Sequence, residues 1–345
     1  MKKYLFMAVA ALATLTACQP GDEPQTIVQT REICFATTAL ETRANDVTPV
    51  TTATLKEFAV WGYIMADNAA PANVQDIFSA TEVRTTDETT TESSIFEAAG
   101  ADVKYWAAST DYMFSAMSPI SEKDKYDYSF NTTSSKFEQK ITGFEIKADE
   151  TTPDLIVARP ASAEVEANKY THAAVGLIFD HMLSRVKFTF TNKFADDNVT
   201  IEISNVTLND VLAKGDATIT STGVATWTPN GNGTIDAVYG TENEIVANAE
   251  QNEVKETVYR YIIPQTATYT VSFDLVVKAD GQTVLTKPYE NVPLTNTAFV
   301  NGKGYVFNAN ISGDLLKEEL HPIQFTVKVT EWVDNDPVDI DLTGK

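Results

Sequence analysis

The sequence predicts an all-β protein, and three observations lead to this class. Apolar residues recur at every second position in many short stretches along the chain. These stretches are rich in Val, Ile, Thr, Phe and Tyr and end at Gly, Asn, Asp or Pro, which is typical of half-buried antiparallel strands. No long segment keeps a helical period, and residues 72–80 are the one place where we expect a short helix. The spacing of the strands suits β-sandwiches.

The first residues predict a leader and a lipid anchor. Two lysines precede an apolar run over residues 4–15, which is shorter than the roughly 20 residues that a membrane-spanning helix needs. The run ends in Leu-Thr-Ala-Cys at residues 15–18, which resembles the lipobox of bacterial lipoproteins. We expect residues 1–17 to be a signal peptide, Cys18 to carry acyl chains such as palmitate, and residues 18–29 to be a flexible tether. A plain secretory signal with a chance cysteine is the alternative.

The length and composition predict two domains with apolar cores. The chain has 345 residues, of which 43% are hydrophobic. A stretch of low apolar periodicity, residues 159–172, divides it into a first domain at 30–165 and a second at 166–345. Lipidation of Cys18 leaves Cys34 as the other cysteine, so we expect no disulfide framework. The net charge of −22 repels nucleic acid, and no nucleic-acid partner is expected.

One change of register predicts a bend in the chain. Leu177 and Phe179 occupy odd positions of an alternating run, whereas Val186 and Phe188 occupy even positions of the next. A continuous strand cannot bury both sets on one face, so a bulge or a crossing between sheets is expected near Ser184.

Motifs of catalysis are missing from the sequence. It contains no H-E-x-x-H, G-x-S-x-G, P-loop or C-x-x-C motif. Of three scattered histidines, His181 lies on an alternating strand and is expected to be a hydrogen-bonded structural residue. Carboxylates are abundant, so a glycosidase-like pair stays open, although nothing singles out two of them. The acidic residues 334–341 lack the glycine and terminal glutamate of an EF-hand. We therefore expect no enzyme, no cofactor and no metal.

An ordered set of segments resembles the fimbrillin (Mfa-like and FimA-like) lipoproteins of Bacteroidales. The segments are the lipobox at Cys18, TRA at 42–44, LKEFAVWGY, DLIVA, VGLIFDHMLSRVKFTF, NGKGYVFNANI and FTVKVTEW. The resemblance implies two tandem transthyretin-like antiparallel β-sandwich domains in a lipidated precursor that reaches the outer membrane. In polymerising members an arginine-specific protease cuts in the N-terminal region. The first strand then leaves, and a strand of another subunit replaces it.

The residues of this chain fit that scheme. Arg43 lies in the polar stretch 41–46, which is typical of an exposed loop where proteolysis concentrates. A cut between Arg43 and Ala44 would release Ile33 and Phe35 from the core and leave an open sheet edge for an incoming strand. An ordinary loop arginine is the alternative. A cut at Arg31 would leave the first strand in place.

The tail supplies the candidate for the incoming strand. Val338, Ile340 and Leu342 alternate with acidic residues and would act as the inward side chains of a donor. The alternative is that this segment completes its own second domain.

The leading hypothesis is a structural protein at the cell surface. It would be a fimbrial shaft, tip or anchor subunit that assembles with other fimbrial subunits, as a homo- or heteropolymer, and supports adhesion. The second hypothesis is a surface glycan-binding lipoprotein, for which the chain's four tryptophans, Trp61, Trp106, Trp227 and Trp332, would have to supply an exposed platform. A secreted hydrolase ranks third.

Overall fold

The computed structural model describes residues 29–39, 54–65, 74–88, 90–91, 94–149, 151–231, 233–242, 244–294, 298–313 and 323–331. Strands dominate these ranges, and the helices among them are two short 3₁₀ segments, η2 (Gly100–Asp102) and η3 (Ile120–Lys125). The prediction of an all-β protein is therefore confirmed. No helix within the described ranges is long and apolar enough to cross a bilayer.

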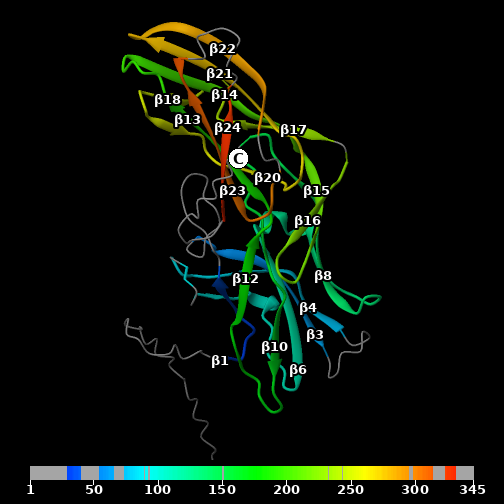
Figure 1. The fold of residues 1–345 in the computed structure, drawn as a ribbon. Helices are drawn as coiled ribbons and strands as arrows, with labels where there is room; N and C mark the ends of the chain where they lie inside the picture. Colours follow the sequence, from blue (N-terminus) through cyan, green and yellow to red (C-terminus); the bar gives the residue numbers. More distant parts are fainter. Residues whose placement is uncertain are drawn as a thin grey trace, which may run out of the picture.

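The lower part of the molecule is built on one eight-stranded sheet (Figure 1). Its strands in spatial order are β4 (Val74–Arg84), β3 (Glu57–Met65), β6 (Thr110–Ser118), β9 (Ile156–Ala158), β12 (Val175–His181), β2 (Phe35–Ala39) and β5 (Ile95–Phe96), with β10 (Ala161–Val165) also paired to β6. A two-residue pair, β1 (Gln29–Thr30) with β11 (His172–Ala173), extends the first strand towards the N-terminus.

This sheet folds over on itself, because its two ends pack face to face. Phe35 on β2 packs against the rings of Phe58 on β3, Phe78 on β4 and Phe114 on β6. All four rings belong to one buried cluster. The first strand thus faces the opposite end of its own sheet across an aromatic core.

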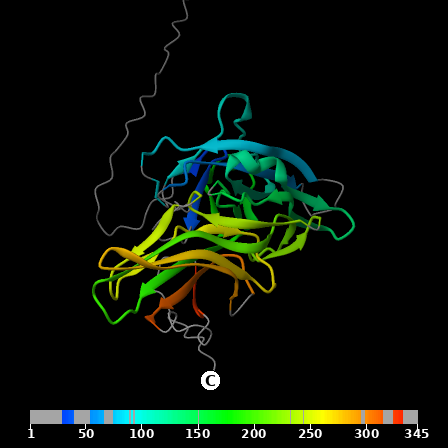
Figure 2. The same ribbon diagram turned by 90° about the horizontal axis from the view of Figure 1, so that it is seen from above.

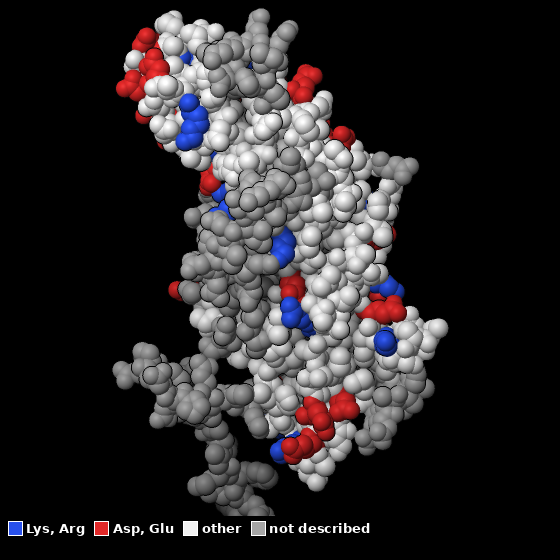
Figure 3. All heavy atoms as spheres, in the orientation of Figure 1, with Lys and Arg blue, Asp and Glu red and all other residues white. Residues whose placement is uncertain are grey.

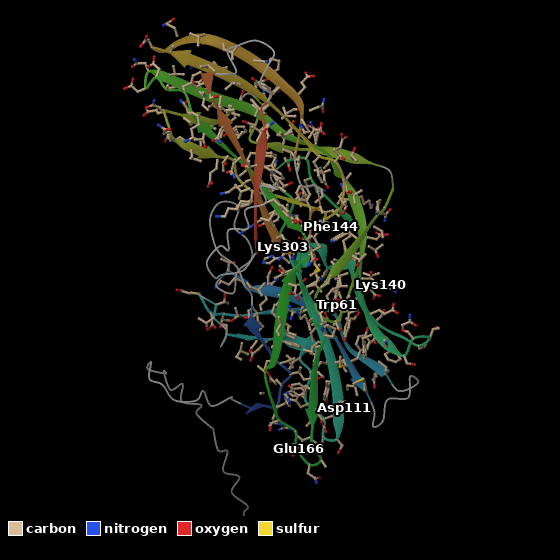
Figure 4. The ribbon with its side chains drawn as sticks, viewed as in Figure 1. Trp61, Asp111, Lys140, Phe144, Glu166 and Lys303 are labelled. Carbon is tan, nitrogen blue, oxygen red and sulfur yellow. The ribbon has the colours of Figure 1, made fainter. Side chains whose placement is uncertain are left out.

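Strand β3 is buried on both faces, which explains its nearly continuous apolar sequence. Phe58 faces the aromatic core of the lower part, whereas Trp61 and Tyr63 face the other way. There they pack on β7 (Tyr126–Asn131) and β8 (Lys136–Glu145), with ring centroids 4.7 Å apart for Trp61 and Tyr126. Figure 4 shows Trp61 near the middle of the molecule, below Phe144.

The upper part is a β-sandwich of two five-stranded sheets. One contains β19 (Val254–Glu256) and β20 (Arg260–Ile262) beside β13 (Ser184–Asn192), then β23 (Lys303–Ile311) and β24 (Phe325–Glu331). The other contains β17 (Thr234–Tyr239) and β18 (Ile245–Ala249) beside β14 (Val199–Leu212), then β21 (Thr270–Ala279) and β22 (Gln282–Pro293). Figure 2 shows the two layers from above. Phe190 and Phe273 join them, with ring centroids 5.3 Å apart.

A four-stranded sheet joins the two parts of the chain. Its order is β16 (Ala225–Pro229), β15 (Lys214–Ile219), β8 and β7, so that Ala217 of the second half pairs with Ile141 of the first. Trp61, Phe144 and Phe188 all belong to one buried cluster, which runs from this four-stranded sheet into the upper sandwich. The two parts therefore share a core rather than meeting through a linker.

Among the described residues most strand pairs are antiparallel, as expected, but two are parallel. These are β2 with β12 and β13 with β23. Alternation of apolar residues reports which face is buried and carries no information about the direction of a neighbour, so the sequence could not show this.

The expectation of a short helix at residues 72–80 was wrong. Residues 74–84 form β4, which pairs with β3 and sends Phe78 and Val83 into the aromatic core. Pairing and burial thus outweigh a weak local helical tendency.

The chain crosses between the two parts at Met182 and Leu183. The expected bend near Ser184 is confirmed, because β12 ends at His181 in the lower sheet and β13 begins at Ser184 in the sandwich. Residues 161–181 still pair within the lower sheet through β10 and β12. The division into domains at residue 165 or 166 stays a prediction, and the pairing favours a crossing at Met182.

Candidate functional site

The first strand, residues 29–39, is held by main-chain hydrogen bonds on both sides. On one side it pairs with β11 and β12, where Val175 N donates to Cys34 O over 2.8 Å. On the other it pairs with β5 and with residues 104–106, where Ile33 N donates to Lys104 O over 2.9 Å and Trp106 N donates to Arg31 O. The segment is the dark blue strand at the lower left of Figure 1.

The side chains of this strand are part of the core. Ile33 is 3% exposed and Phe35 is fully buried, as the alternation in the sequence indicates. The Phe35 ring lies edge-on to Phe114 and Phe78, with centroids 5.4 and 5.8 Å away. Gly62 leaves the room for this packing, because a Cβ there would lie 2.8 Å from both the Phe114 and Phe78 rings.

Two further buried residues of the strand were not foreseen as site residues. Cys34 has a buried thiol whose Sγ lies 3.4 Å from Glu32 O, and the side chain of Thr37 is fully buried opposite Leu177. The signal for Thr37 was present, because it continues the alternation of Ile33 and Phe35 by one more step. Threonine is polar, so Thr37 does not stand out as a buried position in a pattern of apolar residues.

Loss of residues 29–39 would therefore open a groove in the shape of a strand. Its floor would be the rings of Phe58, Phe78 and Phe114, and its walls would be the unpaired main-chain groups of β12 and β5. Such a groove favours refilling by another extended chain with apolar side chains at alternate positions.

The remaining predicted site residues lie outside the described residues. They are Cys18, Arg43, Ala44, Val338, Ile340 and Leu342. Arg43 falls in the connection between β2, which ends at Ala39, and Leu55, which is buried in the aromatic core. The tail follows β24, the strand at the end of its sheet order.

Comparison with protein families matches residues 42–332 to the fimbrillin-like family. The chain belongs to this family. The matched range begins next to Arg43 and ends before the alternating tail, so the first strand and the candidate donor both lie outside it. A comparison with curated proteins found no match.

Solved structures match this fimbrillin-like chain to different extents. A fimbrial protein from Bacteroides vulgatus is 14% identical, with a TM-score of 0.53 over 80% of this chain and 93% of that one. A protein described as a cell adhesion protein from Bacteroides uniformis is 17% identical, with a TM-score of 0.48 over 88% and 98%. The fimbrial anchor protein Mfa2 from Porphyromonas gingivalis is 9% identical, with a TM-score of 0.35 over 88% and 98%.

The tryptophans of this fimbrillin-like protein bear on the glycan-binding hypothesis. Trp61 and Trp106 are buried, and Trp332 lies outside the described residues. Trp227 is half-buried, packs on Phe144 and donates a hydrogen bond from Nε1 to Met182 O over 2.9 Å. The three described tryptophans therefore pack the core and the crossing rather than forming an exposed platform.

A cleft of about 460 Å³ lies beside β18 and β19. Asp149, Glu244, Glu256 and Arg260 line it, and the Arg260 guanidinium donates to the carbonyls of Val238 and Ala148. Arg260 and two donated hydrogen bonds from Thr151 hold the pKa of Asp149 below its usual value, with the Thr151 bonds as the larger cause.

The described histidines are tied into the fold. His181 Nδ1 lies 3.0 Å from Asp154 Oδ1, and both side chains are buried. His172 contacts Ala173 O through Nδ1, and its ring packs on Trp106. Within the described ranges no group of three or more His, Cys, Asp or Glu side chains is arranged to hold a metal ion.

The lower end of the molecule is acidic on the face shown in Figure 3. Figure 4 labels Asp111 and Glu166 there, and the pairing of β6 with β10 sets Asp111 opposite Glu164. Lys169 forms an ion pair with Glu166 over 2.8 Å. This end of the surface would repel polyanions such as nucleic acids.

Proposed function

We propose that this fimbrillin-like protein is a structural subunit of a cell-surface fimbrium, as shaft, tip or anchor, and that it supports adhesion. Acyl chains on Cys18 hold the precursor at the outer membrane. An arginine-specific protease cuts between Arg43 and Ala44, and residues 29–39 then leave their groove. The tail of another subunit replaces them. The burial of Ile33 and Phe35 on the first strand is the observation that carries this proposal.

The strength of the joint follows from what the first strand buries. Filling each inward position with a large apolar side chain contributes about 1.5–3 kcal/mol. Each main-chain hydrogen bond that an incoming strand remakes adds about 1 kcal/mol before the loss of conformational entropy. The inward side chains and the main-chain hydrogen bonds on both sides of an incoming strand together stabilise one joint of the proposed fibre.

The cut matters because it changes the resident strand from a tethered segment to a separate peptide. While residues 40–56 connect it to β3, its local concentration at the groove is high and a competitor is excluded. After the cut the chain no longer links it to the groove, and a competing strand can take its place. Arg31 lies before Ile33, so a cut there would leave this tether intact.

The test uses precursor purified without its lipid, from which residues 1–18 have been removed. Treatment with an arginine-specific protease is expected to give a product that begins at Ala44, read by mass spectrometry. Oligomers resistant to mild heating in detergent then accumulate with time. Arg43→Ala should block both steps, whereas the matched variant Arg31→Ala should leave both unchanged.

Two outcomes would contradict the proposal. One is cleavage at Arg43 while the released strand stays bound and the protein stays monomeric. The other is assembly that proceeds equally well in Arg43→Ala. Anchoring is tested separately by palmitate labelling in cells, where Cys18→Ser is expected to remove the label and to shift the protein out of the outer-membrane fraction.

A further inference from the structure

The third inward position of the first strand is occupied by a polar residue that the core does not satisfy. Ile33, Phe35 and Thr37 share the inward face, and Thr37 is fully buried opposite Leu177. Among the described residues, no hydrogen-bond partner lies within reach of Thr37 Oγ1. The strand thus carries a buried hydroxyl in a slot whose cross-strand neighbour is aliphatic.

Other buried threonines show what this position lacks. Thr257 Oγ1 accepts from Phe188 N and donates to Val258 O, both over 3.0 Å. Thr152 Oγ1 accepts from Lys147 N over 2.7 Å. Thr37 shares its lack of a partner with Thr90, which lies outside the first strand. Burying a hydroxyl without a hydrogen bond is unfavourable, so Thr37 weakens the hold of the strand on its groove.

We infer that the slot of Thr37 selects the incoming strand, and that it takes a large aliphatic side chain. This inference rests on the function proposed above. It adds the feature that decides whether residues 29–39 or an incoming strand binds the groove more tightly. Residues 29–39 therefore fill the groove less well than they could, because their inward face carries two apolar side chains and one hydroxyl without a hydrogen bond. A strand with three aliphatic side chains at alternate positions fills the same groove without that penalty.

The occupant that fits is residues 338–342 of a second copy of this chain. Val338, Ile340 and Leu342 are three aliphatic residues at alternate positions, and the residues between them are the acidic Asp339 and Asp341. Whichever of the three reaches the Thr37 slot, it replaces a hydroxyl-bearing side chain with an aliphatic one. At this slot the incoming strand is therefore favoured over the resident strand.

The experiment compares Thr37→Val with wild type, first as uncut precursor and then after cleavage at Arg43. Valine has the shape of threonine without the hydroxyl, so Thr37→Val is expected to raise the thermal midpoint of the precursor. After cleavage it is expected to slow the appearance of oligomers on the order of tenfold, because the resident strand holds its groove more tightly. A synthetic peptide of residues 28–40 with valine at position 37 should likewise inhibit assembly more strongly than the wild-type peptide.

Two matched variants control for the change of residue type. Thr257→Val removes a buried hydroxyl that has its hydrogen bonds and lies away from the groove. It should lower the thermal midpoint of the precursor and leave the rate of oligomer formation after cleavage as in wild type. Thr218→Val lies at an exposed position of β15 and should change neither. A Thr37→Val midpoint equal to or below wild type, or equal assembly rates with a raised midpoint, would overturn the inference while wild-type assembly upheld the proposed function. Failure of the wild type to assemble would overturn both.

Discussion

The ring of Phe35 meets the ring of Phe114 edge-on, with centroids 5.4 Å apart, and so joins the first strand to the middle of the lower sheet. Phe35 lies upstream of the range that matches the fimbrillin-like family, whereas Phe114 lies inside it. The lower core is therefore completed by a residue that the proposed cleavage would remove. A precursor with the strand and a processed chain without it should differ sharply in stability.

Phe35→Ala is expected to lower the free energy of unfolding of the precursor by about 3–5 kcal/mol, because it leaves a cavity among three aromatic rings. Urea titration followed by tryptophan fluorescence measures this. The matched variant is Ile178→Ala, on the neighbouring strand β12, where the side chain is 38% exposed and the cost should be much smaller. Equal costs for the two variants would show that the first strand is not part of the core.

Alternation in the sequence was enough to place the inward face of the first strand and the crossing near Ser184. Both depend on which face of a strand is buried, and a period of two reports that directly. Ile33 and Phe35 are buried, and the strand breaks at Met182 and Leu183, where the odd positions give way to even ones.

The partners of each strand could not be read in the same way. The pairing of β8 with β15, and the parallel pairs of β2 and β13, join residues far apart in the chain, and no local pattern encodes them. Polar residues surround Trp227 in the sequence, yet its indole Nε1 donates a hydrogen bond to Met182 O at the crossing. Thr37 was missed because its slot is apolar while its side chain is not.

Ile340→Asp in the tail is expected to stop chain growth while leaving the fold of the precursor unchanged. A charge at an inward position of a donor strand would be buried in an aromatic groove without a partner, which costs several kcal/mol. Size-exclusion chromatography after protease treatment measures growth, and thermal melting measures the fold. Asp339→Asn, at an outward position, should assemble as wild type does.

If Ile340→Asp instead unfolds the precursor, the tail belongs to the core of its own sandwich. The alternative use of this segment would then be supported in place of donation. Mixing the variant with wild type separates the two uses further. A subunit with a defective donor and an intact groove should still be captured at one end of a growing chain.

Gly223→Ala is expected to loosen the junction between the two parts. Gly223 lies in the turn between β15 and β16 with φ of +80°, and an added Cβ would lie 1.8 Å from Asp180 Oδ2. Arg159 holds that carboxylate with two bonds of 2.7 Å, so the side chain cannot move away freely. Strain and clash together should lower the free energy of unfolding by about 2–4 kcal/mol.

Gly231→Ala separates the clash from the backbone strain. Gly231 has φ of +98°, and among the described residues no atom beyond its chain neighbours lies within 4 Å of an added Cβ, so only the strain of about 1–2 kcal/mol applies. Removal of the clashing carboxylate with Asp180→Ala should reduce the cost of Gly223→Ala to the same level. A cycle in which the two changes were simply additive would show that the turn does not press on β12.

Alkaline pH is expected to lower the free energy of unfolding through Tyr63, which packs β3 against β7. Its hydroxyl donates to Tyr128 O, and burial, aided by Asp76 and Asp127, raises the pKa of Tyr63 to about 12. Because the folded state holds the proton more tightly than the unfolded chain, this contribution is fully present below about pH 10. It is lost as the pH rises towards 12.

Tyr63→Phe isolates this contribution. At pH 8 the variant should be less stable than wild type by about 1–2 kcal/mol, because Tyr128 O loses its donor. Above pH 10 the difference should shrink by on the order of 1 kcal/mol per pH unit, since phenylalanine has no proton to lose. Urea titrations at pH 8, 10, 11 and 11.5 measure this, with Tyr105→Phe, at a side chain 60% exposed, as the matched control. A difference that stayed constant over this range would mean that the Tyr63 hydroxyl is not sealed in the shared core.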